Sequence, residues 1–170
     1  MLKIFNKLVP FFEDNYRRIN VREYSRLLKI SPPSASKILN ELREEGLLIK
    51  EEEKNYLYFY ANKENFLFIN LQIIYYREKF NKIGLFDALE KDFINPVVIL
   101  FGSFAKAEVN ENSDIDLAIF SLRKKDINLN EYEIKLKRKI QVFSFNKKED
   151  VKNEMLLNNI LNGFKILGDW

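Results

Sequence analysis

Two short apolar runs in the second half of the chain constrain its fold more than any other feature. They are residues 96–101 (PVVILF) and residues 117–120 (LAIF). Both runs are β-branched and aromatic and are bounded by turn-forming residues, which is typical of buried strands. Between them lie Gly102-Ser103 and two aspartates, Asp114 and Asp116. The sequence therefore predicts a strand, a turn and a second strand, with polar groups gathered at one edge.

The residue types at this edge favour phosphate and metal chemistry. A Gly-Ser pair after a buried strand allows backbone N–H groups to turn towards a ligand, most naturally a phosphate at a helix N-terminus. Asp114 and Asp116 are two residues apart on a strand and therefore point to the same face. Two neighbouring carboxylates repel each other, and a divalent cation relieves that repulsion. The structural alternative is a strand–turn–strand with two surface aspartates.

The segments 102–108 (GSFAKAE) and 113–117 (SDIDL) resemble the paired signature of the polymerase-β-type minimal nucleotidyltransferases, Gly-Ser-x-Ala-x-Gly and Ser-Asp-x-Asp-Leu. The resemblance implies a nucleotidyltransferase-like α/β domain with a small mixed sheet over residues 93–170. It also implies that Gly102, Ser103 and Lys106 bind ATP or another nucleoside triphosphate. Asp114 and Asp116 would then be the catalytic residues and the Mg²⁺ ligands.

Two positions depart from the family pattern. The last glycine of the first segment is Ala107 here. The family's third metal carboxylate lies on a later strand, for which residues 140–145 (IQVFSF) are the candidate, and its position holds Gln141. A neutral amide oxygen is a poor magnesium ligand beside a carboxylate. The fold of the domain is therefore expected, whereas Gln141 counts against its enzymatic activity.

Composition narrows the chemistry further. The 170 residues include no cysteine and no histidine. This excludes disulfides, thiolate zinc sites and imidazole ligands, so any metal must be held by oxygen, as Mg²⁺ is. The net charge of +3 is compatible with nucleic-acid binding. No apolar run approaches the roughly 20 residues of a membrane helix, and no signal peptide is evident, so we expect a cytoplasmic protein without membrane contact.

Residues 1–62 carry the signals of three helices and a hairpin. Apolar spacing predicts helices over residues 2–13 and 21–28, with Tyr24, Leu27 and Leu28 of the second facing inward. A third helix would be capped by Ser31, ended by Gly46 and followed by a β-hairpin. This order of three helices and a hairpin resembles the winged helix-turn-helix domain of transcription regulators. The resemblance implies that residues 33–43 are a recognition helix. Its outward residues, the candidate DNA contacts, are Ser34, Ser36, Lys37, Asn40 and Arg43.

Two observations bear on that DNA contact. Any amphipathic helix has a solvated polar face, which is the structural alternative for these five residues. The expected tip of the wing carries Glu51, Glu52 and Glu53, which a phosphate backbone would repel. The wing would then stay away from DNA, or the module would bind another partner.

Residues 63–92 are expected to form connecting helices, the first opening at Asn62-Lys63 with Lys79 near its end. The apolar residues from Phe66 to Tyr76 exceed what a linker needs and predict burial by the two domains or by a homodimer. After the signature, residues 129–138 are predicted to form an exposed segment that could be helical, and residues 151–166 to form a helix.

The complete prediction is an α+β protein with two alternative functions. The first is a DNA-binding, transcription-regulator-like protein whose degenerate nucleotidyltransferase domain binds nucleotide and magnesium. The second is an active nucleotidyltransferase that transfers NMP from ATP to a protein, RNA or small molecule, as antitoxin members of the family act on a toxin partner. A third hypothesis is an interaction protein with no chemistry of its own. The hypotheses differ in whether Gln141 is compatible with two-metal phosphoryl transfer.

Overall fold

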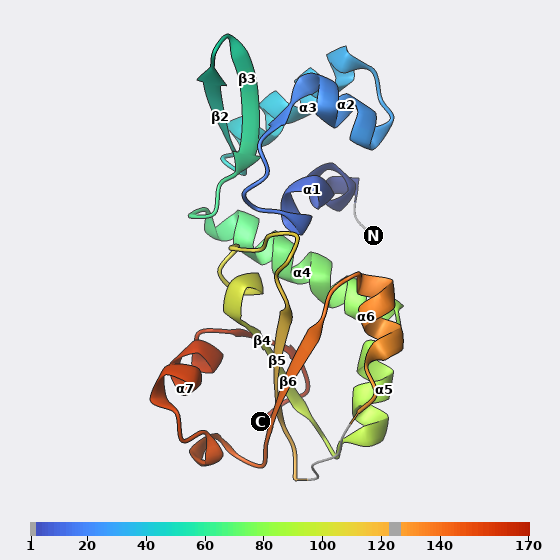
Figure 1. Ribbon diagram of the computed structural model, residues 1–170, viewed down its shortest axis with the longest axis vertical. Helices are drawn as coiled ribbons and strands as arrows, with labels where there is room; N and C mark the ends of the chain where they lie inside the picture. The colour runs from blue at the N-terminus through green and yellow to red at the C-terminus, as the bar shows by residue number, and fades with distance from the viewer. Residues whose placement is uncertain (1–2, 123–126) are drawn as a thin grey trace. The chain divides into compact units, whose positions relative to one another are not determined.

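The computed structural model describes residues 3–122 and 127–170, and the chain forms two compact units. The first unit comprises Met1–Gln72 together with Ala107–Glu111, and the second comprises Ile73–Lys106 together with Asn112–Trp170. The segment between the two halves of the signature therefore belongs to the first unit, although its neighbours in sequence belong to the second. Figure 1 labels the elements of both units.

The first unit contains three helices and a small antiparallel sheet with strand order β1-β3-β2. The helices are α1 (Lys3–Glu13), α2 (Val21–Leu28) and α3 (Pro32–Glu44). The strands are β1 (Ile19–Asn20), β2 (Leu48–Glu53) and β3 (Tyr56–Ala61). The aromatic residues Phe5, Phe11, Phe12, Tyr24 and Phe59 are buried and supply much of the core of this unit.

Local signals explain the bounds of the helices. Asn20 Oδ1 accepts the Glu23 N–H at 3.0 Å and begins α2, and Ser31 Oγ accepts the Ser34 N–H at 3.3 Å and begins α3. Gly46 follows α3 with φ of +74°, a conformation that glycine adopts without strain. The predicted helices 21–28 and 31–46 are thereby confirmed. The predicted inward orientation of Leu27 is wrong, because this side chain is 43% exposed.

The hairpin differs from the sequence expectation at its tip. Glu51, Glu52 and Glu53 lie on β2, and the turn is formed by Lys54 and Asn55, which both have positive φ. Arg18 forms ion pairs with Glu51 at 3.2 Å and with Glu53 at 2.7 Å. The carboxylates are therefore along the strand rather than at the tip, and an arginine compensates two of them.

A buried polar cluster holds the segment Ala107–Glu111 within the first unit. Asn15 is 1% exposed, and its N–H donates to the Val109 carbonyl at 2.8 Å. Its side-chain oxygen accepts the Val109 N–H at 2.8 Å, and its amide nitrogen donates to Phe11 O at 2.7 Å and Gln72 Oε1 at 2.6 Å. One side chain thus satisfies three buried polar groups.

The second unit is built around a mixed sheet of four strands in the order β6-β5-β4-β7. The strands are β4 (Val97–Phe101), β5 (Ile115–Phe120), β6 (Ile140–Phe145) and β7 (Phe164–Leu167). Strands β5 and β6 are parallel, and the other pairs are antiparallel. All five residues of β4 are buried, so both faces of this strand are covered.

Helices cover the two faces of the sheet (Figure 1). The α-helices that contribute to this unit are α4 (Phe66–Lys82), α5 (Leu85–Asp92), α6 (Asn130–Leu136) and α7 (Glu154–Leu161). Single 3₁₀ turns occur at η1 (Gly102–Phe104) and η2 (Lys148–Asp150). Ile160 of α7 packs against Val97, Ile99 and Phe101, which alternate along β4 with residues that face the opposite side.

Helix α4 begins later than the sequence indicated. Asn65, not Asn62, provides the N-terminal cap, since its side-chain oxygen accepts the Leu67 N–H at 2.8 Å. Lys79 and Lys82 lie in its last turn, as predicted for Lys79. Phe66 is 82% exposed and Leu67 is 53% exposed, whereas Phe68, Tyr75 and Tyr76 are buried. None of the helices in the described residues is long and apolar enough to cross a membrane.

One prediction for the C-terminal region is wrong. The expected helix over residues 151–166 ends at Leu161, and Phe164 begins β7, an edge strand antiparallel to β4. A Cβ on Gly163 would lie 2.6 Å from the Leu100 carbonyl, so close backbone packing requires glycine at this bend. The segment 129–138 contains the helix α6, whose residues Glu131, Ile134 and Lys135 are exposed as predicted, while Tyr132 and Leu136 are buried.

The Asn15 cluster leads to a first prediction. Asn15→Ala removes the partners of buried backbone groups, so we expect a loss of about 1–3 kcal/mol in the free energy of unfolding. The Val109 amide should also exchange its hydrogen faster. Urea unfolding and hydrogen exchange would measure both effects. The matched control is Asn70→Ala at an exposed position of α4, which we expect to change stability by less than about 0.5 kcal/mol. Equal stability of the two variants would contradict the role given to Asn15.

Candidate functional site

Three strands bring the signature residues to one edge of the sheet. Strand β4 ends there at Phe101, and the parallel strands β5 and β6 begin there. Asp116 is paired with Phe101 on one side and with Gln141 on the other. The structure therefore brings together four of the residues singled out from the sequence: Gly102, Asp114, Asp116 and Gln141.

Gly102 is needed where the chain leaves β4. It has φ of +67°, and a Cβ at this position would overlap the Asp116 Oδ2 atom. The carboxylate thus lies directly against the backbone of the Gly-Ser turn. The turn itself is the single 3₁₀ turn η1, not the start of an α-helix, so the expected helix N-terminus for a phosphate is wrong. The donors that Gly102 and Ser103 can provide to a ligand are the backbone N–H groups of this short turn.

The carboxylate pair has an unequal environment. Gln141 Nε2 donates a hydrogen bond to Asp114 Oδ2 at 3.0 Å. Burial raises the pKa of Asp116 above its ordinary value, and the neighbouring Asp114 carboxylate raises this pKa further. A nearby cation would stabilise the ionised form of a carboxyl group whose pKa is raised in this way. The negative charge of Asp116 is therefore unfavourable without a nearby cation, whereas Asp114 accepts a hydrogen bond from an amide.

The position of the missing family glycine is also distinctive. Ala107 is fully buried and has φ of +51°, in the left-handed region that favours glycine. An alanine in this conformation carries roughly 1–2 kcal/mol of backbone strain. Val109, two residues later, is held by Asn15 within the first unit. The fixed segment explains how the left-handed turn persists without glycine.

Arg138 is a residue that sequence reasoning missed. Its Nη1 donates to the Ser113 carbonyl at 2.8 Å, and its guanidinium lies 5.4 Å from the centre of the Phe104 ring. Phe104 belongs to the first half of the signature and Ser113 to the second. Arg138 thereby connects the two halves. The only signal in the sequence is the basic run 137–139 just before β6, which has no fixed spacing from the motif.

Lys106, the third expected nucleotide contact, is exposed and lies further along the chain than the 3₁₀ turn. Its Nζ is 3.4 Å from Asn159 Oδ1 on α7, which identifies Asn159 as a second neighbour of the turn that the motif did not reveal. Lys106 and Asn159 thus flank the side of the turn on which α7 lies.

The donor set can be compared with what magnesium requires. Asp114 and Asp116 supply two carboxylates, and Gln141 presents an amide N–H to them. Among the described residues, no group of three or more acidic side chains could hold a metal ion. The residues present therefore fit one oxygen-bound cation shared with a ligand, and they do not fit a site held by three carboxylates.

The expected DNA contacts all lie on α3. Ser34, Lys37 and Arg43 are exposed, and Ser36 and Asn40 are half-buried. Several of these groups bond locally: Asn40 Nδ2 donates to Ser36 O at 2.8 Å, and Ser34 Oγ is 2.9 Å from Ser31 Oγ. The neighbouring helix α2 adds Arg22 and Arg26, and Lys29 follows its last residue. All three are exposed, and none of them was predicted to contact DNA.

Comparison with family models agrees with the geometry of the second unit. Residues 87–167 match the model for the family described as "Polymerase beta, Nucleotidyltransferase". The matched range runs from α5 to β7 and includes the whole four-stranded sheet. This part of the chain is a nucleotidyltransferase-type domain, a class that generally uses a nucleoside triphosphate and Mg²⁺. Comparison with curated proteins gave no match for the chain, and neither did comparison with solved structures.

The pKa of Asp116 leads to a second prediction. Because the pKa of Asp116 is raised in the folded state, ionisation of this carboxyl lowers the free energy of unfolding at pH values above that pKa. At pH values below about 3.9, the ordinary pKa of aspartate, the carboxyl is protonated in both the folded and the unfolded state, and this cost is absent. Stability should therefore fall as the pH rises through this window. Asp116→Asn removes the penalty, so we expect this variant to be more stable than the parent at pH 7 in EDTA.

The same experiment has an internal test. The advantage of Asp116→Asn should disappear as the pH is lowered through the ordinary range of aspartate. Urea midpoints at several pH values would measure it, with Glu90→Gln at an exposed carboxylate of α5 as the control. An advantage that did not vary with pH would show that ionisation of Asp116 is not its cause.

Proposed function

We propose that this chain is a DNA-binding protein whose nucleotidyltransferase-type domain binds a nucleoside triphosphate with Mg²⁺ but transfers nucleotide very slowly or not at all. The observation that carries the proposal is the hydrogen bond from Gln141 Nε2 to Asp114 Oδ2, in register with Asp116. The Gln141 amide N–H thus occupies the position at which two-metal catalysis would need a third carboxylate. A ligand that brings its own Mg²⁺ still finds two carboxylates beside the Gly-Ser turn.

The chemical argument concerns the second metal ion. Two-metal phosphoryl transfer requires one ion to activate the attacking hydroxyl and another to stabilise the leaving group. With one carboxylate fewer, the site has less negative charge to hold the ion that activates the hydroxyl. The hydroxyl then keeps its proton and remains a weak nucleophile. Triphosphate binding at Gly102 and Ser103 does not depend on that ion.

The DNA-binding part of the proposal is supported by the first unit. Its order of helices, followed by a hairpin in a three-stranded antiparallel sheet, is the order of a winged helix-turn-helix domain. Lys37 and Arg43 on α3 and Arg22 and Arg26 on α2 offer cations for phosphates. The ion pairs of Arg18 with Glu51 and Glu53 reduce the repulsion that the hairpin would exert on DNA. A homodimer, which would present two copies of α3, stays a prediction.

A second candidate function is an active nucleotidyltransferase with a protein, RNA or small-molecule acceptor, which includes a toxin-like partner. It is favoured by the presence of both Asp114 and Asp116, the second of which lies against the Gly102 turn. Incubation with labelled ATP, first with Mg²⁺ and then with Mn²⁺, separates the two candidates. Ready transfer of label by the wild-type chain, lost in Asp116→Ala, would replace the regulator proposal with the enzyme.

The third prediction tests DNA binding. The Lys37→Ala/Arg43→Ala double variant should lose a mobility shift that the wild-type chain shows with duplex DNA. Two lost phosphate contacts should also lower the slope of log affinity against log salt by about 1.8, since each contact contributes about 0.9. The matched control is Lys147→Ala/Lys152→Ala, two exposed lysines outside the first unit. An unchanged shift in the α3 variant would exclude this helix as the DNA contact.

The fourth prediction tests the metal argument. Gln141→Asp adds a third carboxylate, so its stability without metal should fall, and Mg²⁺ with a non-hydrolysable ATP analogue should restore it. Gln141→Asn is the matched control, because it has the same length as aspartate and no charge. Thermal unfolding with and without Mg²⁺ would measure both variants. A response of the asparagine variant equal to that of the aspartate variant would show that charge at this position does not govern metal binding.

A further inference from the structure

Strand β2 forms one edge of the sheet in the first unit, because the strand order is β1-β3-β2. Five of its six residues are exposed, and the exception is Leu48 at its start. The strand carries the three consecutive glutamates 51–53, for which DNA binding provides no reason. An exposed edge strand is a surface on which a further strand can pair.

The direction of the backbone groups on β2 follows from its pairing with β3. The Asn62 N–H donates to the Leu47 carbonyl at 3.0 Å, so these two residues form a hydrogen-bonded pair next to the ladder. Hydrogen-bonded and non-hydrogen-bonded pairs alternate along an antiparallel ladder. The N–H and C=O groups of Leu48, Lys50 and Glu52 therefore point away from β3. In the described part of the chain, no strand pairs with this side of β2.

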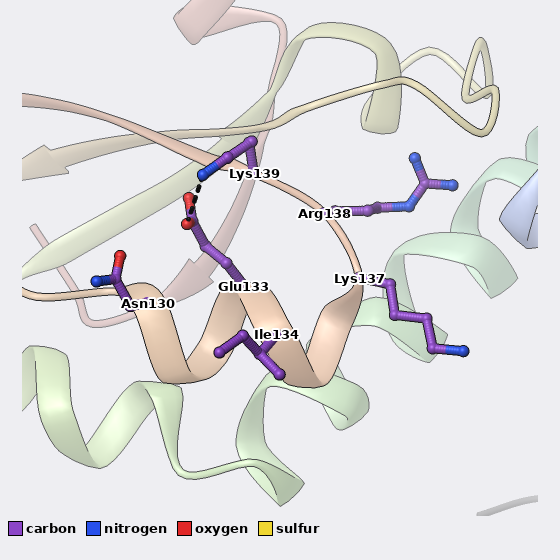
Figure 2. Close-up of a pocket in the computed structure, with 6 residues that line it drawn as sticks. All are labelled: Asn130, Glu133, Ile134, Lys137, Arg138 and Lys139. Carbon is purple, nitrogen blue, oxygen red and sulfur yellow. Dashed lines mark hydrogen bonds and ion pairs between the residues drawn. The ribbon is translucent and has the colours of Figure 1, made fainter.

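The sheet of the second unit shows how this chain protects a comparable edge. Its edge strand β6 has side chains bonded to the outward N–H groups at both of its ends. The Ile140 N–H donates to Glu133 Oε1 at 2.9 Å. The Asn146 N–H donates to Asp150 Oδ2 at 3.2 Å. Figure 2 shows Glu133 directed from α6 towards this edge, where it also pairs with Lys139. Among the residues that the structure describes, no side chain bonds to the outward N–H groups of β2 in this way.

The open edge of β2 carries one cation and one anion that are not compensated. Lys50 and Glu52 are two residues apart on one strand, so their side chains lie on the same face of the sheet. Both side chains are exposed, and within the described residues neither has an ion-pair partner. Opposite charges that face each other on neighbouring strands stabilise a sheet. A strand that presents an anion to Lys50 and a cation to Glu52 would therefore fit this edge.

A second copy of β2 meets this requirement in one antiparallel register. With Glu51 opposite Glu51 of the second copy, Lys50 of each copy faces Glu52 of the other. Both positions have outward backbone groups, so this register forms four backbone hydrogen bonds and two ion pairs. A shift of two residues in one direction places Lys50 opposite Lys50, and a shift in the other direction places Glu52 opposite Glu52. Like charges disfavour both of these registers.

One contact in the favoured register is repulsive. The two Glu51 carboxylates face each other across the two-fold axis, on the face opposite to Lys50. Each of them is paired within its own chain with Arg18 at 3.2 Å, and Arg18 also pairs with Glu53 at 2.7 Å. The two arginines reduce the repulsion at the centre of the contact. The glutamates also disfavour pairing in other registers, which limits open-ended association of the edge.

We propose that β2 pairs with β2 of a second copy of this chain, which joins the two small sheets into one antiparallel sheet of six strands. The Lys50–Glu52 pairs select the register, and the outward backbone groups supply the hydrogen bonds. This contact would assign a definite surface to the homodimer expected from the sequence. It requires neither DNA contact by α3 nor nucleotide binding at Gly102, so it can be tested independently of the proposed function.

The fifth prediction concerns charge reversal at the edge, measured by sedimentation over a concentration series. The wild-type chain should approach twice its mass of 20.3 kDa as its concentration rises. Lys50→Glu alone and Glu52→Lys alone should each weaken self-association about tenfold, because each change turns two attractive pairs into repulsive ones. An equimolar mixture of the two variants should associate as the wild type does, since their charges are complementary at both pairs. Recovery in the mixture also shows that each variant is folded.

The matched controls are Lys147→Glu and Glu149→Lys, which make the same changes of charge at exposed positions of the second unit. Both should associate as the wild type does. A wild-type chain that stays monomeric at high micromolar concentration would overturn the proposal and leave the open edge to a strand of another protein. Equal weakening in the controls, or no weakening in the β2 variants, would overturn it as well.

Hydrogen exchange of the wild-type chain tests where the two copies meet. The amides of Lys50 and Glu52 should exchange more slowly as the concentration of the chain rises, because they become bonded only in the dimer. The amides of Ile49 and Glu51 should be slow at every concentration, since they are bonded to β3. Self-association without this added protection at Lys50 and Glu52 would show that the copies meet at another surface, and would refute pairing through β2.

Discussion

The parallel pairing of β5 with β6 is the contact on which the candidate site depends. Its register places Gln141 beside Asp116, and the Gln141 side chain reaches Asp114 at 3.0 Å. Shifting the pairing by one residue would turn these side chains to the other face of the sheet. The register is fixed because Leu117 and Ile119 alternate with Ala118 and Phe120 into the two buried sides of the sheet. Core packing therefore determines which polar groups meet.

Electrostatics at this edge of the sheet follow from that geometry. Asp116 is partly buried beside a second carboxylate, so its ionised form is unfavourable without a cation. Gln141 and Arg138 supply donors to Asp114 and to the Ser113 carbonyl, and so hold the second half of the signature without a metal ion. This arrangement suits a domain that keeps the shape of a nucleotide site. It also explains why restoring a carboxylate at Gln141 should make the fold depend on the metal.

The two compact units are interleaved in sequence, because Ala107–Glu111 folds with the first unit. Asn15 bonds both backbone groups of Val109, and Ala107 accepts a left-handed conformation that glycine would adopt more easily. Contacts within the first unit thus explain how the chain can carry Ala107 at a position where the family has glycine. The strain at Ala107 is offset by the contacts that fix the segment after it.

Elements whose signals are local could be predicted from the amino-acid sequence. These are the capped helices α2 and α3, the apolar strands β4 and β5, and the paired motif with Asp114, Asp116 and Gly102. Features that depend on partners distant in the sequence could not be predicted in this way, because their cause lies in the folded chain. Phe164 and Ile166 continue a helical spacing in sequence, yet they form β7 because Gly163 allows the backbone to approach Leu100. The hydrogen bonds made by the side chains of Asn15, Arg138 and Gln141 could not be predicted either. A hydrogen bond to a residue far away in the sequence leaves no periodic pattern in the chain.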